Sequence, residues 1–207
     1  MARKRERGNG DTASRILDVA ERLVQSRGFN SFSYADVAAE LNLSKPSLHY
    51  HFPGKAELGE ALIARYAARF AEALEEIDRR GGDAPAKLEA YARIYADVLS
   101  DRRMCLCGML AADYDTLPKP MRDAVIRFFD DNEAWLARVL EQAQEKGTLR
   151  LNGSPNEAAQ ALVSGLEGAL LIARPYGDVA RFEAGATRLL TSFVDGESPD
   201  RISPSRT

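Results

Sequence analysis

The chain has 207 residues, of which 45% are apolar and 29% charged, and this is the composition of a globular protein with one large domain or two small ones. No apolar run approaches the roughly 20 residues of a membrane-spanning helix, and no apolar segment follows the basic N-terminus to make a secretory signal. We therefore expect no membrane association and a cytoplasmic location. Two cysteines are too few for a disulfide framework.

The net charge of −3 is unevenly distributed along the chain. Residues 1–55 contain 9 Lys and Arg against 6 Asp and Glu, a balance of +3, whereas residues 56–207 contain 19 against 25, a balance of −6. A basic N-terminal part joined to a larger acidic part favours an anionic partner for the former, although a difference of this size also arises by chance.

The first periodic segment has apolar residues at helical spacing from Ala13 to Val24, and it predicts a helix of about four turns. Asp11 or Thr12 can cap its start, and Gly28 stands where a helix commonly ends. Residues 1–10 precede this pattern and are predicted to be a disordered basic arm.

Two short helices are expected next. Ser33 can cap the first, with Asp36 three residues later as a carboxylate form of the capping box. Asn42 can end it, since asparagine tolerates a left-handed backbone better than most residues. Ser44 can then cap the second short helix, and Pro46 falls in its first turn, where a missing N–H does no harm.

Longer helices follow, and no convincing β-alternation appears. Their apolar stripes run over residues 58–74, 88–99, 125–143, 158–173 and 182–193, with a shorter segment at 104–114. We expect an all-α fold of about nine helices, divided into a smaller part at 11–55 and a larger helical part at 56–194. The polar tail, residues 195–207, is predicted to be disordered.

The informative stretch is FSYADVAAELNLSKPSLHYHFPGKAEL, residues 32–58. Two short helices joined by a tight turn have the form of a helix-turn-helix, whose second helix enters the major groove of DNA. If Leu48 and Phe52 point inward, then Lys45, His49 and Tyr50 project outward with Pro46. Charge, hydroxyls and an aromatic ring on one face are typical of a DNA-contacting surface.

This stretch resembles the TetR/AcrR family of transcriptional regulators. The resemblance rests on Ser44-Lys45, on the run from Leu48 to Phe52 and on Lys55 with Leu58, together with Arg27-Gly28-Phe29 and Asp36-Val37-Ala38. Two positions depart from the family pattern. Asn42 replaces the usual Gly, and His49 replaces the usual Tyr. The family's Tyr contacts a DNA phosphate, so the resemblance implies that either His49 or the adjacent Tyr50 makes this contact here.

The resemblance implies an N-terminal three-helix DNA-binding domain followed by a ligand-binding and dimerisation domain. The implied DNA contacts are Ser33, Tyr34, Ala35, Ser44, Lys45, Pro46, Ser47, His49, Tyr50, His51 and Lys55. Tyr34 is as readily a core residue. The basic residues of the N-terminal arm, Arg3, Lys4, Arg5 and Arg7, either contact DNA, as minor-groove arms do, or form a solvated tail.

The resemblance also implies a homodimer, formed through the last two helices at about 156–174 and 178–194, on a two-fold operator in double-stranded DNA. A small-molecule effector would bind the middle helices and release the protein from DNA. The candidate ligand-binding residues are Tyr66, Phe70, Tyr91, Tyr95, Cys105, Met109, Phe128 and Trp135. Aromatic stripes at helical spacing are also typical of a plain core.

The sequence leaves two alternatives to ligand-responsive repression. Arg102 and Arg103 precede Cys105 and Cys107 and could activate a thiol, so an oxidant- or electrophile-sensing regulator is one alternative. A helical interaction module without DNA binding is another. An enzyme is disfavoured because both histidines lie in the predicted recognition helix, and no Gly-rich phosphate loop or nucleophile elbow is present. We expect no cofactor and no metal, since the cysteines do not have zinc-site spacing.

Overall fold

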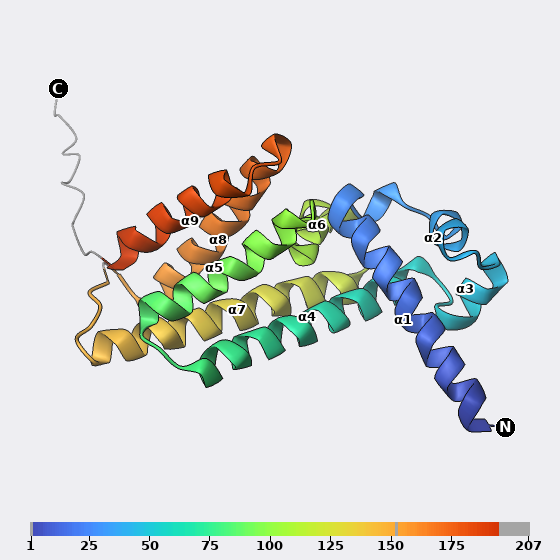
Figure 1. The fold of residues 1–207 in the computed structure, drawn as a ribbon, viewed down its shortest axis with the longest axis horizontal. Helices are drawn as coiled ribbons and strands as arrows, with labels where there is room; N and C mark the ends of the chain where they lie inside the picture. Colours follow the sequence, from blue (N-terminus) through green and yellow to red (C-terminus); the bar gives the residue numbers. More distant parts are fainter. Residues whose placement is uncertain (1, 152, 195–207) are drawn as a thin grey trace. The chain divides into compact units, whose positions relative to one another are not determined.

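The computed structural model describes residues 2–151 and 153–194, with side chains from residue 11 to 193. In this part of the chain all regular structure is helical, with no strand (Figure 1). The α-helices are α1 Ala2–Arg27, α2 Tyr34–Leu41, α3 Lys45–His51, α4 Lys55–Arg80, α5 Ala84–Ser100, α6 Leu106–Ala112, α7 Lys119–Glu145, α8 Pro155–Ala173 and α9 Val179–Val194. Short 3-10 helices are η1 Phe29–Ser31, η2 Tyr114–Thr116 and η3 Arg174–Tyr176. The tail that we expected to be disordered lies outside the described residues.

The chain divides into two compact units. The first contains the residues up to Glu75 together with Asp97–Asp130, and the second contains Glu76–Ala96 and the residues from Asp131 onward. The long helices α4, α5 and α7 each contribute to both units. The helix-turn-helix segment, residues 33–55, lies entirely in the first.

Helix α1 begins earlier than the sequence predicted. The N-terminal segment expected as a disordered arm is helical from Ala2 onward, and α1 runs without interruption to Arg27. Alanine, arginine, lysine and glutamate all favour the helix, and no proline interrupts the segment. The predicted end is confirmed, because Gly28 adopts φ 89° and its N–H donates to the Val24 carbonyl at 2.8 Å.

Apolar side chains from every helix of the first unit form its core. In α1 they follow the predicted spacing, and α2 packs beside both α1 and α3 (Figure 1). The fully buried members with less than 1% exposure include Ile16, Ala20, Val24, Val37, Leu48, Leu58, Leu106 and Met121. Because α2 and α3 have only 8 and 7 residues, each contributes few side chains to this core.

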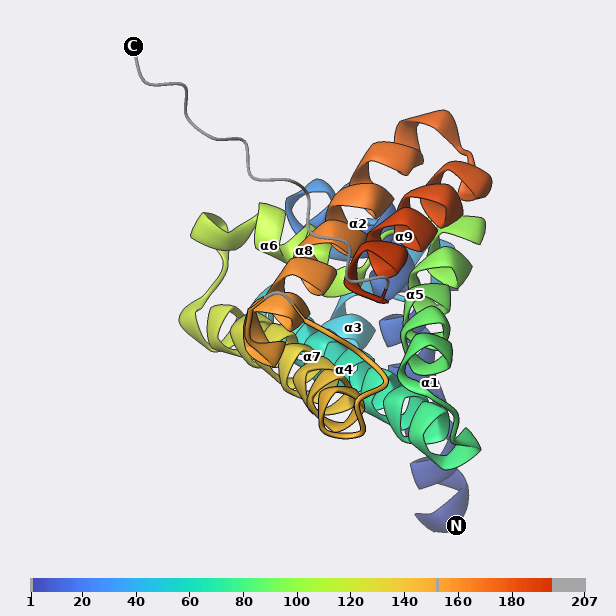
Figure 2. The same ribbon diagram turned by 90° about the vertical axis from the view of Figure 1, so that its left-hand side faces the viewer.

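In the second unit α8 and α9 lie side by side, as both views show (Figures 1 and 2). Ser154 caps α8 in a full capping box with Glu157, and Pro155 occupies its first turn. The predicted break between α7 and α8 is therefore confirmed. Gly165 allows the close approach of the pair, since a Cβ there would lie 2.5 Å from Cδ2 of Leu189.

Candidate nucleic-acid interface

The start of α2 is held by its own side chains. The backbone N–H and the hydroxyl of Ser33 both donate to Oδ2 of Asp36 at 2.7 Å, completing the capping box that the sequence predicted. These hydrogen bonds from Ser33 hold the pKa of Asp36 below its ordinary value. The cap fixes where α2 begins, and it leaves Ser33 and Ala35 exposed at the helix start.

The turn between α2 and α3 depends on Asn42. Its backbone is left-handed, with φ 54° and ψ 43°, and the N–H of Leu43 then donates to the Ala38 carbonyl at 2.9 Å. A non-glycine residue accepts this conformation more readily when it is asparagine. The expectation that Asn42 can stand in the place of a glycine is confirmed.

Helix α3 presents a polar outer face. Ser44 caps it by accepting a hydrogen bond from the Ser47 N–H at 3.3 Å, and Pro46 lies in the first turn. Leu48 is fully buried, whereas Tyr50 is 75% exposed. Lys45, Pro46 and His49 are exposed as well. The inward and outward sides of α3 are therefore those that the sequence predicted, with Phe52 only half-buried.

His49 is exposed, but two contacts hold its ring in place. Its Nδ1 lies 2.9 Å from the Pro53 carbonyl oxygen, and its ring packs 4.9 Å from that of Tyr34. The adjacent Tyr50 ring contacts only His51 edge-on, at 5.3 Å. His49 thus presents one edge of a braced ring, and Tyr50 presents most of its surface to solvent.

Two of the expected DNA contacts, Tyr34 and Lys55, have hydrogen-bond partners inside the protein. The hydroxyl of Tyr34 lies within hydrogen-bonding distance of the carbonyls of Phe52, at 2.9 Å, and Gly54, at 2.6 Å. Burial, with a smaller effect of the Glu57 carboxylate, raises the pKa of Tyr34 to about 12. Tyr34 therefore ties the start of α2 to the end of α3, which agrees with the core role that the sequence left open for it.

Lys55 also has partners inside the protein. Its ammonium donates to the carbonyls of Phe29, at 2.5 Å, and Phe32, at 2.6 Å, and lies over both of their rings. Burial lowers the pKa of Lys55, and the Asp113 and Asp36 carboxylates oppose that effect. Lys55 is the first residue of α4, and hydrogen bonds from a charged donor are among the stronger ones in proteins. The two hydrogen bonds of its ammonium therefore hold the start of α4 against the chain that precedes α2.

Sequence reasoning missed Asp113, which follows α6. Its Oδ2 accepts hydrogen bonds from the backbone N–H groups of Phe29, at 2.8 Å, and Asn30, at 3.4 Å. The side-chain amide of Asn30 also donates to Oγ1 of Thr116 at 2.8 Å. These residues are more than 80 positions apart in the chain, and no local pattern could have paired them.

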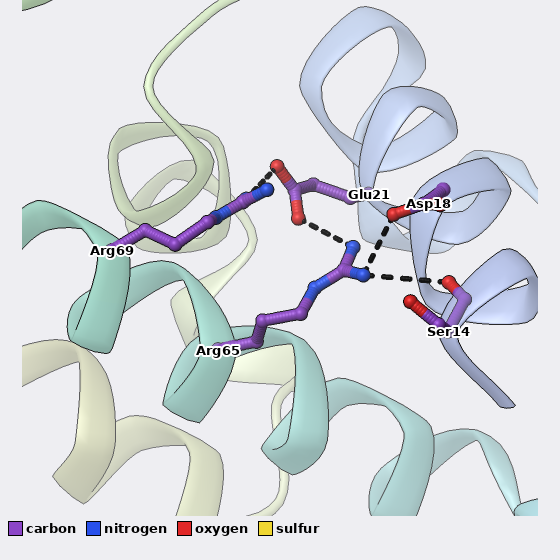
Figure 3. Close-up of polar contacts among 5 residues, drawn as sticks. All are labelled: Ser14, Asp18, Glu21, Arg65 and Arg69. Atoms are coloured by element: carbon purple, nitrogen blue, oxygen red, sulfur yellow. Dashed lines mark hydrogen bonds and ion pairs between the residues drawn. The ribbon is translucent and has the colours of Figure 1, made fainter. Parts of the chain in front are cut away.

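An ionic network joins α1 to α4 (Figure 3). The guanidinium of Arg65 donates to Asp18 at 2.7 Å and to Glu21 at 2.8 Å, and Arg69 pairs with the other oxygen of Glu21. Glu21 is only 6% exposed, so its charge depends on these two arginines. The network anchors α4, which follows the helix-turn-helix segment, against α1.

The ligand-binding candidates fall into two aromatic clusters, one in each unit. In the first unit the Phe128 ring packs against Tyr66, at 5.6 Å, and Phe70, at 5.1 Å. In the second unit Tyr91 stacks on Trp135 at 5.8 Å, and its hydroxyl lies 3.2 Å from that of Tyr95. All six are buried.

The remaining two candidates, Cys105 and Met109, lie at the start of α6 and within it. Cys105 is its N-cap, and its sulfur accepts a hydrogen bond from the Gly108 N–H at 3.5 Å. Cys105 and Cys107 are both buried, and Met109 is half-buried. Burial removes both thiols from contact with dissolved oxidants, so the geometry does not favour a thiol sensor.

Comparison with known proteins identifies the family. Residues 16–62 match the family described as bacterial regulatory proteins, tetR family. Residues 84–189, which are more than half of the chain, match the tetracyclin repressor-like C-terminal domain. The chain belongs to the TetR family. It is a DNA-binding transcriptional regulator with a helical C-terminal domain of the ligand-binding kind.

Individual relatives agree with this assignment. The transcriptional regulator AcuR of Cereibacter sphaeroides is 31% identical over 152 residues, which are 72% of this chain and 69% of that protein. The repressor NemR of Escherichia coli K12 is 27% identical over 168 residues, 79% of this chain and 84% of its own. A TetR-family regulator from Agrobacterium tumefaciens has a crystal structure that superimposes with a TM-score of 0.86 at 30% identity, over 90% of this chain and 99% of that one.

In this TetR-family regulator a groove of about 530 Å³ lies between α5 and α9 of the second unit. Its floor is apolar, from Leu88, Ala92 and Phe182, and its rim carries Glu89 and Arg93. None of the eight candidate ligand-binding residues lines this groove. An apolar floor with a few polar groups at the rim is typical of small-molecule sites.

The described residues contain no candidate membrane span and no candidate metal site. None of the helices there is both long and apolar enough to cross a membrane. No group of three or more His, Cys, Asp and Glu in that part of the chain is arranged to hold a metal ion.

Proposed function

We propose that this regulator represses transcription from a two-fold operator and is released by a small-molecule effector. The observation that carries the proposal is the outer face of α3, which presents an exposed lysine, two histidines and a tyrosine. The position of this helix is fixed by its Ser44 cap, by the turn at Asn42 and by the Tyr34 hydroxyl at its C-terminal end. The relative NemR is named a repressor, and a dimer placed over a promoter obstructs polymerase. We take residues 11–55 as the DNA-binding part and 56–194 as the effector-binding and dimerising part.

In this proposal α3 enters the major groove and the start of α2 meets the phosphate backbone. Tyr34 and Lys55 position these helices and do not touch DNA. Tyr50 replaces the family's tyrosine at the phosphate, since its side chain is 75% exposed, whereas the His49 ring packs on Tyr34. The proposed contacts are Ser33, Ala35, Ser44, Lys45, Pro46, Ser47, His49, Tyr50 and His51.

The proposed dimer forms through α8 and α9. On α8, Leu171 and Ile172 are 56% and 59% exposed, and neighbouring apolar side chains this open are candidates for an interface. A Cβ added at Gly168 would meet no atom within 4 Å, so the surface there is open, whereas Gly165 is already occupied by the packing of α9. Two copies joined this way carry two helix-turn-helix segments to one operator.

The effector is proposed to bind the groove between α5 and α9. The aromatic clusters are the second candidate, because a ligand could enter by displacing their rings. A thermal-shift screen finds compounds that raise the melting temperature of the wild type. An Ala186→Trp variant, which fills the groove, should lose that shift, and Tyr91→Phe should keep it. The opposite result would favour the aromatic cluster.

A gel shift with the DNA flanking the gene tests the function itself. Wild type should retard this DNA at low salt, where phosphate contacts are strongest. Tyr50→Ala and Lys45→Ala should each weaken binding about tenfold. Lys146→Ala, which removes another exposed lysine, this one from the second unit, should bind like wild type. If no band is retarded, DNA binding is refuted, and unchanged affinity in both α3 variants refutes the contact set.

Two further expectations complete the proposal. We expect no catalytic activity, and a substrate-turnover screen that finds one would contradict this. We also expect the protein to act in the cytoplasm, where its operator lies.

A further inference from the structure

A cleft of about 380 Å³ lies in the first unit, at the edge of the ionic network of Figure 3. It is bordered by α1, α2, α4 and the loop that joins α5 to α6. Seven of its eight lining residues are charged. Four of these are the arginines Arg22, Arg65, Arg69 and Arg103, so guanidinium groups from three segments of the chain converge on one space.

The three carboxylates of the cleft are already paired. Asp18 and Glu21 receive Arg65, and Glu21 also receives Arg69. On the other side, Glu40 of α2 pairs with Arg22 of α1. Four guanidinium groups against three carboxylates leave the cleft with one positive charge in excess.

The excess charge belongs to Arg103. It is half-buried, and it forms no ion pair with any residue whose side chain the structure describes. Its backbone is held firmly, because its N–H donates to the Val98 carbonyl at 3.0 Å and the next N–H, of Met104, donates to the Gln25 carbonyl of α1 at 3.1 Å. The backbone at Arg103 is therefore fixed, and its side chain lines the cleft.

We propose that this cleft binds the phosphate or carboxylate group of a small molecule, with Arg103 as its principal partner. A planar guanidinium matches the two oxygens of such a group and binds them with paired hydrogen bonds. Arg69, whose side chain is 49% exposed, uses one nitrogen for Glu21 and supplies a second donor group. A volume of this size is within the range of small-molecule sites.

The carboxylates in the cleft select the kind of anion. Asp18, Glu21 and Glu40 repel any negative charge beyond the one that Arg103 neutralises. A single compact anionic group is therefore favoured over a run of phosphates such as the DNA backbone. An anion held there would join the α5–α6 loop to α1 and α4, and so would stiffen the first unit, which contains the helix-turn-helix segment.

Isothermal titration calorimetry with inorganic phosphate, in a chloride buffer, tests the proposal. Wild type should bind one phosphate per chain, and Arg103→Gln should weaken the affinity at least about tenfold, the cost of losing a charge-assisted pair. The matched control is Arg102→Gln. Arg102 is the exposed neighbour in the same loop and does not line the cleft, so this variant removes the same charge and should stay within about twofold of wild type.

Circular dichroism melting of both variants shows whether each is folded. Absence of saturable binding by a folded wild type would overturn the proposal. Equal weakening in the two variants would do so as well, because it would mean that general charge and not the cleft attracts phosphate.

A gel shift in phosphate-free buffer distinguishes a free anion from the DNA backbone. If the cleft serves a small molecule, Arg103→Gln and Arg102→Gln should bind operator DNA equally well. A selective loss of DNA affinity in Arg103→Gln would assign Arg103 to a DNA phosphate and overturn the proposal. This readout is separate from the Tyr50→Ala and Lys45→Ala tests of the α3 face.

Discussion

The helix-turn-helix segment and the α8–α9 pair are both made of two helices, but different forces hold them. Helices α8 and α9 have 19 and 16 residues and pack along their length through apolar side chains, with Gly165 against Leu189 at their closest approach. Helices α2 and α3 have 8 and 7 residues. A helix of two turns buries little apolar area, so interactions other than apolar packing must fix its position.

In the helix-turn-helix segment that position comes from single polar groups. The ammonium of Lys55 donates to two backbone carbonyls, and the carboxylate of Asp113 accepts from two backbone N–H groups. The hydroxyl of Tyr34 lies within hydrogen-bonding distance of two carbonyls and donates its single hydrogen to them. A buried backbone group without a partner costs about 1–3 kcal/mol. Loss of one polar anchor should therefore change DNA binding as well as stability, whereas a change between α8 and α9 should act through packing alone.

The largest effect is expected for Lys55→Met. Methionine keeps most of the apolar length of the side chain but leaves the carbonyls of Phe29 and Phe32 without a donor, at a cost of about 2 kcal/mol in the free energy of unfolding. Operator affinity should fall too, because α2 loses its anchor. Chemical denaturation and a gel shift measure the two quantities on the same sample.

Lys45→Met is the matched control for Lys55→Met. Lys45 is exposed on α3, so the free energy of unfolding should change by less than about 0.5 kcal/mol, while operator affinity falls. If Lys55→Met leaves stability unchanged and weakens DNA binding only as much as Lys45→Met does, then Lys55 is an ordinary phosphate contact. The anchoring role proposed for Lys55 would then be wrong.

An intermediate effect is expected from two Gly→Ala substitutions in the α8–α9 pair. Alanine at position 165 places a Cβ 2.5 Å from Cδ2 of Leu189, whereas alanine at position 185 meets only the Ala169 Cβ at 3.7 Å. Gly185→Ala should stabilise the protein by about 0.5–1 kcal/mol through helix propensity.

Gly165→Ala gains the same propensity but must displace Leu189, and overpacking costs about 1–3 kcal/mol. We expect a net destabilisation of about 1 kcal/mol, measured by thermal unfolding at a fixed protein concentration. Equal stabilisation by both substitutions would show that α9 yields freely, and that the pair is not held by close packing.

The sequence predicted the local features of the fold because they depend on residues close together in the chain. The capping box of Ser33 and Asp36, the left-handed turn at Asn42 and the cap at Ser44 each involve groups within a few positions of one another. The buried side of α3 followed from helical spacing alone. The start of α1 differs from the prediction, because the apolar pattern by which it was placed begins after the helix does.

The polar anchors could not be predicted because their partners are distant in the chain. Lys55 stands where the family carries a lysine, and resemblance alone cannot say whether its ammonium reaches DNA or two carbonyls 23 and 26 residues earlier. Asp113 reaches the chain before α2 across 84 positions. For Tyr34 the sequence left core and contact equally open, and only the position of its hydroxyl distinguishes them.

The smallest effect is therefore expected for Tyr34→Phe. The ring and its packing on His49 remain, and only the hydroxyl that meets the carbonyls of Phe52 and Gly54 is lost. Because Phe52 and Gly54 are only half-buried, the free energy of unfolding should fall by about 0.5 kcal/mol at neutral pH. Ser33→Ala, which removes an exposed hydroxyl from the same helix start, serves as the comparison for DNA affinity.

The pH dependence of this loss identifies its source. The pKa of Tyr34 is raised to about 12 in the folded protein, above the value of about 10 expected when unfolded. The hydroxyl's contribution is then complete below about pH 10 and disappears as the pH rises through the folded pKa, because the unfolded chain releases its proton first. The difference in stability between wild type and Tyr34→Phe should shrink from pH 10 towards pH 12. A difference that stays constant over that interval would mean that the hydroxyl is not the anchor, and that α2 is held by its ring alone.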